Sequence, residues 1–320
     1  MSNLPKVVVI GGGTGLSVIL RGLKTYPVDL SAIVTVADDG GSSGRLRKEL
    51  NMPPPGDVRN VLVALAEVEP LIERLFQHRF ENGEGLSGHS LGNLLLAGMT
   101  SITGDFARGI SELSAVLNVR GNVLPASNES IELVAKMVDG SVVHGESNIP
   151  NAGKAIEQMS IEPAFPEALP ASIQAIQQAD KIIMGPGSLY TSVLPNLLVP
   201  DIAREIAQAK ADKIYICNVM TQSGETDGFT ASDHIKALHA HVGESLIEDI
   251  FVNDTELPAA LIERYAEEDA EAVICDDASL QALGLNVVKD HFIRTDDLLL
   301  RHDAEKIAGM ILGNEGGDDS

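Results

Sequence analysis

The sequence lacks several features that would assign it to particular classes of protein. It has no tryptophan, only two cysteines and 3% aromatic residues in a chain of 320. Cys217 and Cys275 lie in apolar, strand-like runs, so we expect buried, reduced thiols and no disulfide. No run approaches the roughly 18 apolar residues of a membrane span, and no signal peptide is visible. These absences predict a cytoplasmic globular protein with no membrane span.

Positive charge is scarce as well. Lysine and arginine number 23 against 46 acidic residues, which gives a net charge of −23. Because nucleic acids and anionic membrane surfaces are polyanions, this balance argues against both as partners. Part of the negative charge lies over 315–320, which we expect to be a disordered acidic tail. We expect instead a small-molecule nucleotide as partner, a homo-oligomeric assembly and a regulatory protein partner.

Glycine, by contrast, is concentrated near the start of the chain. A hydrophobic run ends in Gly11-Gly-Gly-Thr-Gly15, and an apolar helical pattern follows over 16–23. The turn departs from the Rossmann fingerprint because Leu16 replaces the third glycine, and it lacks the Gly-Lys-Ser/Thr of a P-loop. Small residues let backbone N–H groups approach a ligand, and a helix N-terminus favours anions. The stretch predicts a phosphate-binding turn of a non-standard kind, the alternative being a turn that binds nothing.

An acidic pair follows the second predicted strand, over 30–36. Asp38 and Asp39 come directly after it, within a loop rich in glycine and serine. Ligands of open α/β sheets bind at the carboxyl ends of the strands, so this loop should lie beside the glycine turn. The two carboxylates could accept hydrogen bonds from sugar hydroxyls or hold Mg²⁺. Arg45, with Arg47 and Lys48, adds a small basic cluster, and a solvated loop is the alternative reading.

Asp57 follows three prolines and is placed to cap a helix over 58–68. We predict that capping role for it. Arg59 and Asn60 fall in the first turn of the same helix, where they face either water or the pocket. The sequence leaves both orientations open.

His89 stands just before another predicted helix start. Ser90 is expected to cap that helix, which runs to about Thr103. In this glycine-rich setting His89 could donate to a phosphate or act as an acid or base. A structural role is the equal alternative.

The rest of the chain predicts the fold class. Short alternating runs over 119–163 indicate a small antiparallel β insertion. We expect 1–118 and 164–314 to form the nucleotide-binding α/β core, a Rossmann-like, mostly parallel sheet with helices on both faces. A late apolar run, Ala272–Cys275, is predicted as one more strand, and Asn218 follows another.

The opening design recurs in the second half of the chain. A strand-like run from Lys181 ends in Gly185-Pro-Gly187, and Ser188 follows as a good N-cap for the next helix. A purely structural turn would explain this pattern. Its likeness to the first turn favours a second ligand-binding edge, so the two turns and the Asp38 loop would form a three-sided phosphate site.

Together, these stretches resemble the CofD-like (2-phospho-L-lactate transferase-like) family, and within it the gluconeogenesis-factor (YvcK-type) branch. The resemblance implies a Rossmann-like core that binds a nucleotide diphosphate. In the transferase branch that nucleotide carries a phospholactyl group to a deazaflavin alcohol, usually with Mg²⁺, and an acidic pair lies by the acceptor and metal. Six stretches carry the resemblance in order: Gly11–Ser17, Ala37–Arg45, Gly56–Asn60, Gly88–Asn93, Gly185–Ser192 and the Asn218 loop.

In the gluconeogenesis-factor branch, members resemble binders of nucleotide sugars such as UDP-N-acetylglucosamine, or of dinucleotides such as NAD. The resemblance links them to cell shape and to growth on gluconeogenic carbon sources, and it implies Tyr265 and Arg301 as nucleotide-sugar contacts. Asp38 and Asp39 are the expected metal ligands and, with His89, the catalytic candidates. The predicted ligand contacts are Gly12, Gly13, Thr14, Gly15, Asp38, Ser42, Ser43, Arg45, His89, Asn93, Gly185, Gly187, Ser188, Tyr190, Asn218, Tyr265 and Arg301.

These residues favour a regulator that binds a UDP-sugar or NAD. A Mg²⁺-dependent transferase that moves a phosphoryl-linked group from a nucleotide diphosphate to an alcohol comes second. The low aromatic content of 3% suits the regulator better than a pocket that stacks a tricyclic deazaflavin. An NAD-dependent oxidoreductase comes third, because no acid/base pair suited to hydride chemistry stands out.

Overall fold

The computed structural model describes residues 4–67, 70–296 and 299–313. Its centre is a seven-stranded sheet in the order β10-β9-β8-β7-β1-β2-β3, in which every neighbouring pair runs parallel. The order reverses between β1 and β7, as in a Rossmann sheet, so the predicted α/β class is confirmed. The strands are β1 (Lys6–Gly11), β2 (Asp29–Val34), β3 (Asn122–Pro125), β7 (Lys181–Met184), β8 (Asp212–Ile216), β9 (Asp249–Asn253) and β10 (Asn286–Asp290).

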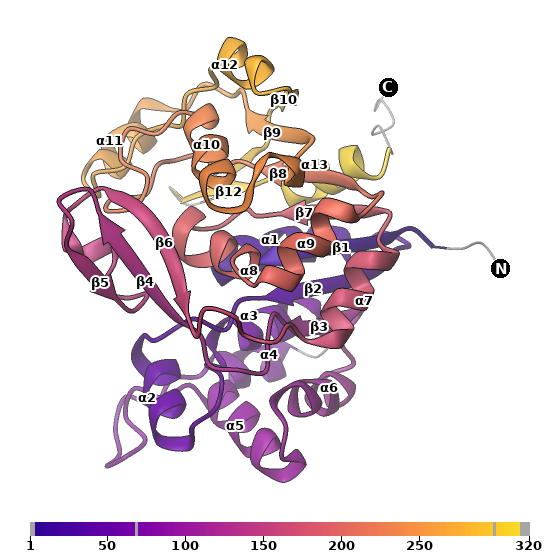
Figure 1. Ribbon diagram of the computed structural model, residues 1–320. Coiled ribbons are helices and arrows are strands. Elements are labelled where there is room, and N and C mark those ends of the chain that lie inside the picture. The colour runs from indigo at the N-terminus through magenta and orange to yellow at the C-terminus, as the bar shows by residue number, and fades with distance from the viewer. Residues whose placement is uncertain (1–3, 68–69, 297–298, 314–320) are drawn as a thin grey trace.

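Helices cover both faces of this sheet because its strands are apolar on both sides. β1, for example, is buried from Val7 to Gly11. α1 packs against α3 and α13, whereas α7, α8 and α9 lie together in front of the sheet in Figure 1. The helices are α1 (Gly13–Leu23), α2 (Gly41–Leu50), α3 (Gly56–Leu65), α4 (Pro70–Gln77), α5 (Leu91–Thr103), α6 (Phe106–Val116), α7 (Pro170–Gln178), α8 (Leu194–Leu197), α9 (Pro200–Gln208), α10 (Ala231–Val242), α11 (Ala259–Ala266), α12 (Asp277–Ala282) and α13 (Ala304–Ile311).

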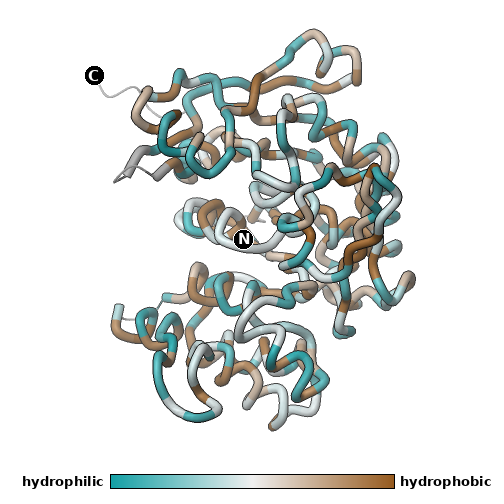
Figure 2. Tube along the Cα trace, turned by 90° about the vertical axis from the view of Figure 1, so that its left-hand side faces the viewer, coloured by the Kyte–Doolittle hydropathy of each residue, from teal (hydrophilic) through white to brown (hydrophobic). Residues whose placement is uncertain are grey.

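Hydrophobic and hydrophilic stretches alternate along the peripheral helices, as expected of helices that bury one face (Figure 2). Within the described ranges no helix is long and apolar enough to cross a membrane. The acidic tail over 315–320 lies outside the described residues.

The small insertion is a three-stranded antiparallel sheet in the order β5-β4-β6. It comprises β4 (Glu132–Met137), β5 (Val142–His144) and β6 (Ile156–Glu162). The expected bounds of 119–163 were too wide, because β3 pairs parallel with β2 and belongs to the main sheet. In Figure 1 this sheet lies on the side away from the N-terminus, next to the carboxyl ends of the main strands.

Two local predictions about elements were wrong, and three strands were missed. The stretch expected as a loop after Asp39 forms α2, because good helix formers occupy its second half. Ala272–Cys275 is no strand: Ala272 makes an isolated bridge to Met220, and both edges of β9 are already paired with β8 and β10. The sequence reading also missed β10 and the hairpin of β11 (Ile293–Asp296) and β12 (Leu299–His302).

Candidate functional site

Three loops meet at one edge of the main sheet, because they leave the neighbouring strands β2, β1 and β7 at their carboxyl ends. The turns after β1 and β7 touch. A Cβ atom on Gly15 would lie 2.6 Å from the carbonyl oxygen of Pro186, and one on Gly187 would lie 3.5 Å from that of Gly12. Glycine at position 15 is therefore required for this contact. The meeting point is where the strand order reverses, the usual place for a ligand in such sheets.

Asp57 supports the first turn. The N-cap of α3 is Pro55, with no side-chain hydrogen bond, so the predicted capping role of Asp57 was wrong. Its carboxylate instead accepts from the N–H of Gly13, at the start of α1. A Cβ atom on Gly12 would lie 2.6 Å from Asp57 Oδ2. Burial and the negative charge of Asp38 raise the pKa of Asp57 to about 7, against the lowering effect of the Gly13 N–H.

A cavity of about 390 Å³ lies beside this turn. Thr14 and Gly15 line it from the turn, Asn60 from α3, and Arg301 from β12. The structure thus brings together two parts of the chain that the sequence reading could connect only through a family resemblance. A guanidinium that lines the same cavity as a helix N-terminus is suited to a doubly charged diphosphate group.

Tyr265 supports Arg301 rather than lining the cavity. Its hydroxyl accepts a 3.2 Å hydrogen bond from the backbone N–H of Leu300, next to Arg301 in β12. His302 does line the cavity, and its Nε2 lies 3.1 Å from the carbonyl oxygen of Cys217. Burial lowers the pKa of His302, which favours a neutral imidazole at the cavity wall.

A second cavity of about 250 Å³ adjoins the first, and Asn60 lines both. Arg59 and Asn93 also line it, so the orientations that the sequence left open for Arg59 and Asn60 are toward the cavities. Arg59 Nε and Asn93 Oδ1 are buried atoms with no hydrogen-bond partner. A buried donor and a buried acceptor around one cavity are groups that a polar ligand would satisfy.

Ser42, Ser43, His89 and Asn93 form a hydrogen-bonded group at this cavity. Ser42 Oγ lies 2.9 Å from His89 Nδ1, and Asn93 Nδ2 donates to Ser42 Oγ at 3.1 Å and to Ser43 Oγ at 3.4 Å. Burial, then the charge of Arg45, lowers the pKa of His89. His89 is therefore held as a neutral side chain that orients Ser42.

Arg45 lines neither of these two cavities. Its guanidinium donates to the carbonyl oxygens of Ser87 at 2.7 Å and Gly85 at 3.1 Å, and so anchors the loop before α5. Ser90 caps α5, which confirms that prediction. Arg59 Nη1 donates to Ser90 Oγ at 2.6 Å, which ties α3 to this cap.

The acidic pair Asp38 and Asp39 diverges. Asp38 lines the second cavity and accepts from the Gly40 N–H at 2.9 Å. Asp39 turns toward the small sheet and accepts from the Ser147 N–H at 2.9 Å. Glu146 directly precedes Ser147 in the chain. Burial raises the pKa of Glu146, and so do the negative charges of neighbouring acids, of which Asp38 has the largest effect. Carboxyl groups from the main core and from the insertion therefore converge at one edge.

A divalent cation would offset this concentration of negative charge. The residues present could hold such an ion, but only through a small number of carboxylates. Within the described part of the chain, the only group of three or more metal-ligating side chains with all ligand atoms within 4.8 Å lies elsewhere, on the small sheet. The cavity therefore offers at most two carboxylates to one ion, with Asp38 and Asp57 both lining it. Mg²⁺ usually binds in this way, through one or two carboxylates plus substrate phosphates.

The second glycine turn is closed by its own neighbours. Gly185 has a φ of +78°, a conformation that favours glycine. Asn218 accepts from the Gly187 N–H at 3.2 Å and donates to the Gly187 carbonyl at 2.9 Å. Ser188 takes the N-cap position of the helical turn at 189–193, as predicted, but its Oγ donates to Gln222 Oε1 at 2.6 Å and makes no capping bond. This turn supports the first one rather than repeating it.

Tyr190 lies beneath the second turn and is only 3% exposed. Its ring packs edge-on against Phe229 and His241. Its backbone N–H and the Thr191 hydroxyl donate to the carboxylate of Glu225, at 3.3 and 2.9 Å. Burial raises the pKa of Glu225 to about 7. Tyr190 therefore contributes to the core under the site.

The sequence reading missed Glu146, Glu225 and His302. The two glutamates share one signal, since each directly follows a glycine with a positive φ, Gly145 or Gly224. His302 directly follows Arg301, which the resemblance did select. None of these signals is strong without the fold that brings the segments together.

Comparisons with known proteins agree with this architecture. A family model described as "2-phospho-L-lactate transferase CofD" matches residues 7–293. A Halalkalibacterium halodurans protein named "Gluconeogenesis factor" is 64% identical over 306 residues, covering 96% of this chain and 95% of its own. A Bacillus subtilis protein of the same name is 56% identical over 312 residues, covering 98% of each. A crystal structure of a UPF0052 family member from Bacillus halodurans superposes with a TM-score of 0.95 at 64% identity, over 96% of this chain and 99% of that one.

Proposed function

Because the chain belongs to the CofD family, we propose that it binds a nucleotide diphosphate at the carboxyl edge of its main sheet. The ligand is a UDP-sugar of the UDP-N-acetylglucosamine type, or NAD. One observation carries the proposal: Thr14 and Gly15 of the first glycine turn and Arg301 of β12 line one cavity, and a second cavity adjoins it at Asn60. Cavities of this size and polarity suit a small molecule with charged and hydroxyl groups.

Each wall has a role in this proposal. The start of α1 and Arg301 hold the diphosphate, since both present N–H donors and positive electrostatic potential. Asp38 and Asn60 accept from or donate to sugar hydroxyls in the second cavity. Arg59 Nε and Asn93 Oδ1, which have no partner, are satisfied by the same part of the ligand.

The ligand-bound protein acts, in this proposal, as a cytoplasmic regulator needed for cell morphogenesis on gluconeogenic carbon sources. Support comes from the name "Gluconeogenesis factor" of two relatives at 64% and 56% identity. The second glycine turn adds support, because Asn218 occupies both the N–H and the carbonyl of Gly187, which are therefore not offered to a second ligand.

The acidic groups favour one other function, a Mg²⁺-dependent transfer from a nucleotide diphosphate to an alcohol. Asp38 and Asp57 line the cavity, and burial raises the pKa of Asp57 to about 7, a range suited to accepting a proton. In such an enzyme the metal neutralises charge on the transferring phosphoryl group. Asp57 would then accept the proton of the alcohol while Asp38 holds the ion.

Binding and turnover are separated by one experiment. The protein is titrated calorimetrically with UDP-N-acetylglucosamine, NAD and GDP, each with and without Mg²⁺, while product formation is followed in the same samples. Binding without product, retained in Asp38→Asn, is the result expected of a regulator. Mg²⁺-dependent product that disappears in Asp38→Asn would replace the regulator with the transferase, and no binding of any of the three would refute both.

A further inference from the structure

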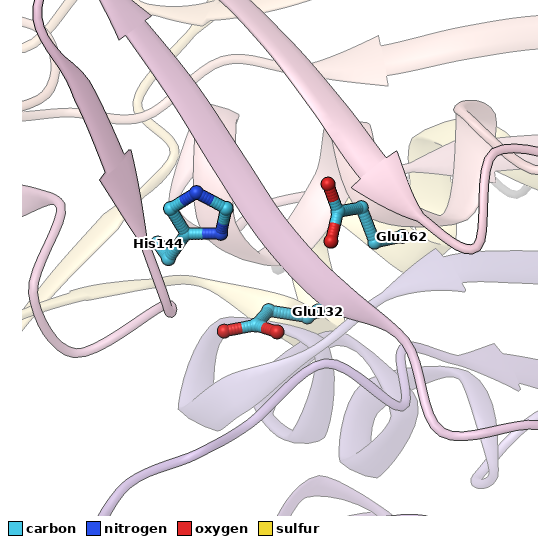
Figure 3. A group of neighbouring side chains, drawn as sticks. All are labelled: Glu132, His144 and Glu162. Atoms are coloured by element: carbon cyan, nitrogen blue, oxygen red, sulfur yellow. The ribbon is translucent and has the colours of Figure 1, made fainter.

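The three strands of the small sheet present a second cluster of ligand-type side chains, apart from the nucleotide edge (Figure 3). Glu132 lies on β4, His144 on β5 and Glu162 on β6. One ligand atom from each, an imidazole nitrogen or a carboxylate oxygen, lies within 4.8 Å of the other two. We propose that these three side chains form a site for a divalent transition metal of the Zn²⁺ class.

The strand register places all three side chains on one face. Glu132 pairs directly with Glu162 across β4 and β6, and His144 pairs with Val134 across β4 and β5. Glu132 and Val134 are two residues apart on β4 and so point to the same side. The arrangement is therefore set by backbone pairing in three strands, and not by the rotamer of one flexible side chain.

The charge of this face is not balanced within the protein. Two carboxylates directly opposite each other in an antiparallel pair repel. The two lysines of the small sheet are occupied elsewhere: Lys136 pairs with Glu157 at 2.8 Å and Lys154 with Asp139 at 2.6 Å. Glu132, His144 and Glu162 have no side-chain hydrogen bond or ion pair to any other described residue. A bound cation would supply the missing positive charge.

The donor set selects the class of metal. Mg²⁺ and Ca²⁺ prefer oxygen ligands alone, whereas one imidazole with two carboxylates suits Zn²⁺ and its neighbours. Tetrahedral Zn²⁺ needs ligand atoms roughly 3.3–3.5 Å apart, as follows from bonds of about 2.0–2.1 Å. Side chains that already lie within 4.8 Å reach this spacing by small rotations. His144 and Glu162 are exposed, so a fourth position stays open to water or to a partner's ligand.

A metal here would tie β5, β4 and β6 together at one point. His144 is followed by Gly145 and Glu146, and the adjacent Ser147 N–H donates to Asp39 at 2.9 Å. Cross-linking the small sheet would therefore fix the segment that brings Glu146 to the nucleotide edge. The inference does not depend on what that edge binds.

The test is calorimetric titration of the full chain with Zn²⁺ in excess Mg²⁺, which occupies oxygen-only sites. A Cys275→Ser background removes the half-buried thiol next to Asp277, where Zn²⁺ could also bind. We expect one equivalent of Zn²⁺ to bind. His144→Ala removes one direct ligand. Because loss of even an outer-shell partner weakens metal binding on the order of 10- to 100-fold, this variant should lose at least that much affinity. Glu162→Gln, which keeps the shape of the side chain, should act in the same direction.

Glu157→Gln is the matched control, because Glu157 lies on the same strand but pairs with Lys136 and is outside the cluster. Its affinity for Zn²⁺ should equal that of the parent. Circular dichroism checks that each variant is folded. If the parent binds no Zn²⁺, or if His144→Ala and Glu162→Gln bind it as tightly as Glu157→Gln does, the proposal is wrong.

Discussion

Two glycine turns leave neighbouring strands of the same sheet, yet they are held by different chemistry. After β1, the N–H of Gly13 meets the carboxylate of Asp57, an ionisable group. After β7, the N–H of Gly187 meets the amide of Asn218, which does not titrate. The first turn borders the cavity of about 390 Å³ through Thr14 and Gly15, and the second turn packs against the first. A similar strand–glycine pattern thus produces a binding turn in one case and a supporting turn in the other.

Whether a glycine turn can bind a ligand depends on which groups already accept hydrogen bonds from its N–H donors. Ser188 and Gly187 are bonded to Gln222 and Asn218, so the second turn has little left to offer a ligand. The first turn begins α1 with no side-chain cap at Gly12. Although Asp57 accepts from the Gly13 N–H, the N–H groups that follow it in the first turn of α1 and the helix dipole remain available to an anion.

The largest effect should follow from forcing the two turns apart. In Gly15→Ala the new methyl would lie 2.6 Å from the backbone oxygen of Pro186. Unlike a side chain, this backbone atom cannot move away by a change of rotamer. We expect a loss of about 1–3 kcal/mol in the free energy of unfolding, as for other overpacked sites, together with loss of nucleotide binding. Urea denaturation and calorimetry measure the two effects.

Gly98→Ala is the control for that variant. Gly98 lies within α5, is exposed, and has open space where a Cβ would stand. Alanine there should stabilise the protein by about 0.5–1 kcal/mol, because glycine is unfavourable inside a helix. Equal stability of the two variants would show that the turns do not touch as described.

The next effect comes from opening the second turn. Asn218→Ala removes both hydrogen bonds to Gly187 and leaves its N–H and carbonyl without these partners. We expect a loss of about 1–3 kcal/mol, the cost of unsatisfied groups, with little dependence on pH. Asn218→Asp keeps an acceptor for the Gly187 N–H and loses only the donor, so it should lose less. If the stability lost in Asn218→Ala depended on pH, the turn could not be held only by the uncharged amide of Asn218.

A pH-dependent effect should mark the first turn. The pKa of Asp57 is raised from 3.8 to about 7, so the folded state holds a proton that the unfolded state releases. Stability from this group is present below about pH 4, falls as the pH rises toward 7 and is then fully lost. Asp57→Asn keeps an acceptor for the Gly13 N–H and should reduce the dependence of the free energy of unfolding on pH. At pH 8 the free energy of unfolding of this variant should be higher than that of the parent by at least about 1.4 kcal/mol, the equivalent of one pKa unit.

Thermal unfolding between pH 4 and 8 measures that slope. Asp139→Asn serves as the control, since Asp139 is an exposed acid on the small sheet paired with Lys154. Its pKa is held low by that pairing, so the variant should lose stability near neutral pH instead of gaining it. A parent whose slope is unchanged by Asp57→Asn would show that another group carries the pH dependence.

Much of this architecture could be predicted from local sequence, and the site only in part. The strand at Lys6–Gly11 and the loops after Val34 and Met184 carry clear patterns, and parallel strands bring such loops to one edge. The role of Asp57 could not be read, because its partner Gly13 is distant in the chain and a proline-flanked acid looks like a cap. Likewise Ala272–Cys275 is apolar enough for a strand, but no edge of the sheet is left for it.

The first glycine turn and Arg301 are proposed to bind one anionic ligand between them. The most direct test is the dissociation constant of UDP-N-acetylglucosamine, or of whichever nucleotide binds best, for the parent, Arg301→Ala and Arg204→Ala. Arg204 lies on α9, paired with Asp201 and Glu205. Losing a charged hydrogen bond worth about 1.5–3 kcal/mol should weaken binding by roughly 10-fold or more in Arg301→Ala and leave Arg204→Ala unchanged. Equal dissociation constants for all three proteins would place the ligand elsewhere and contradict the account.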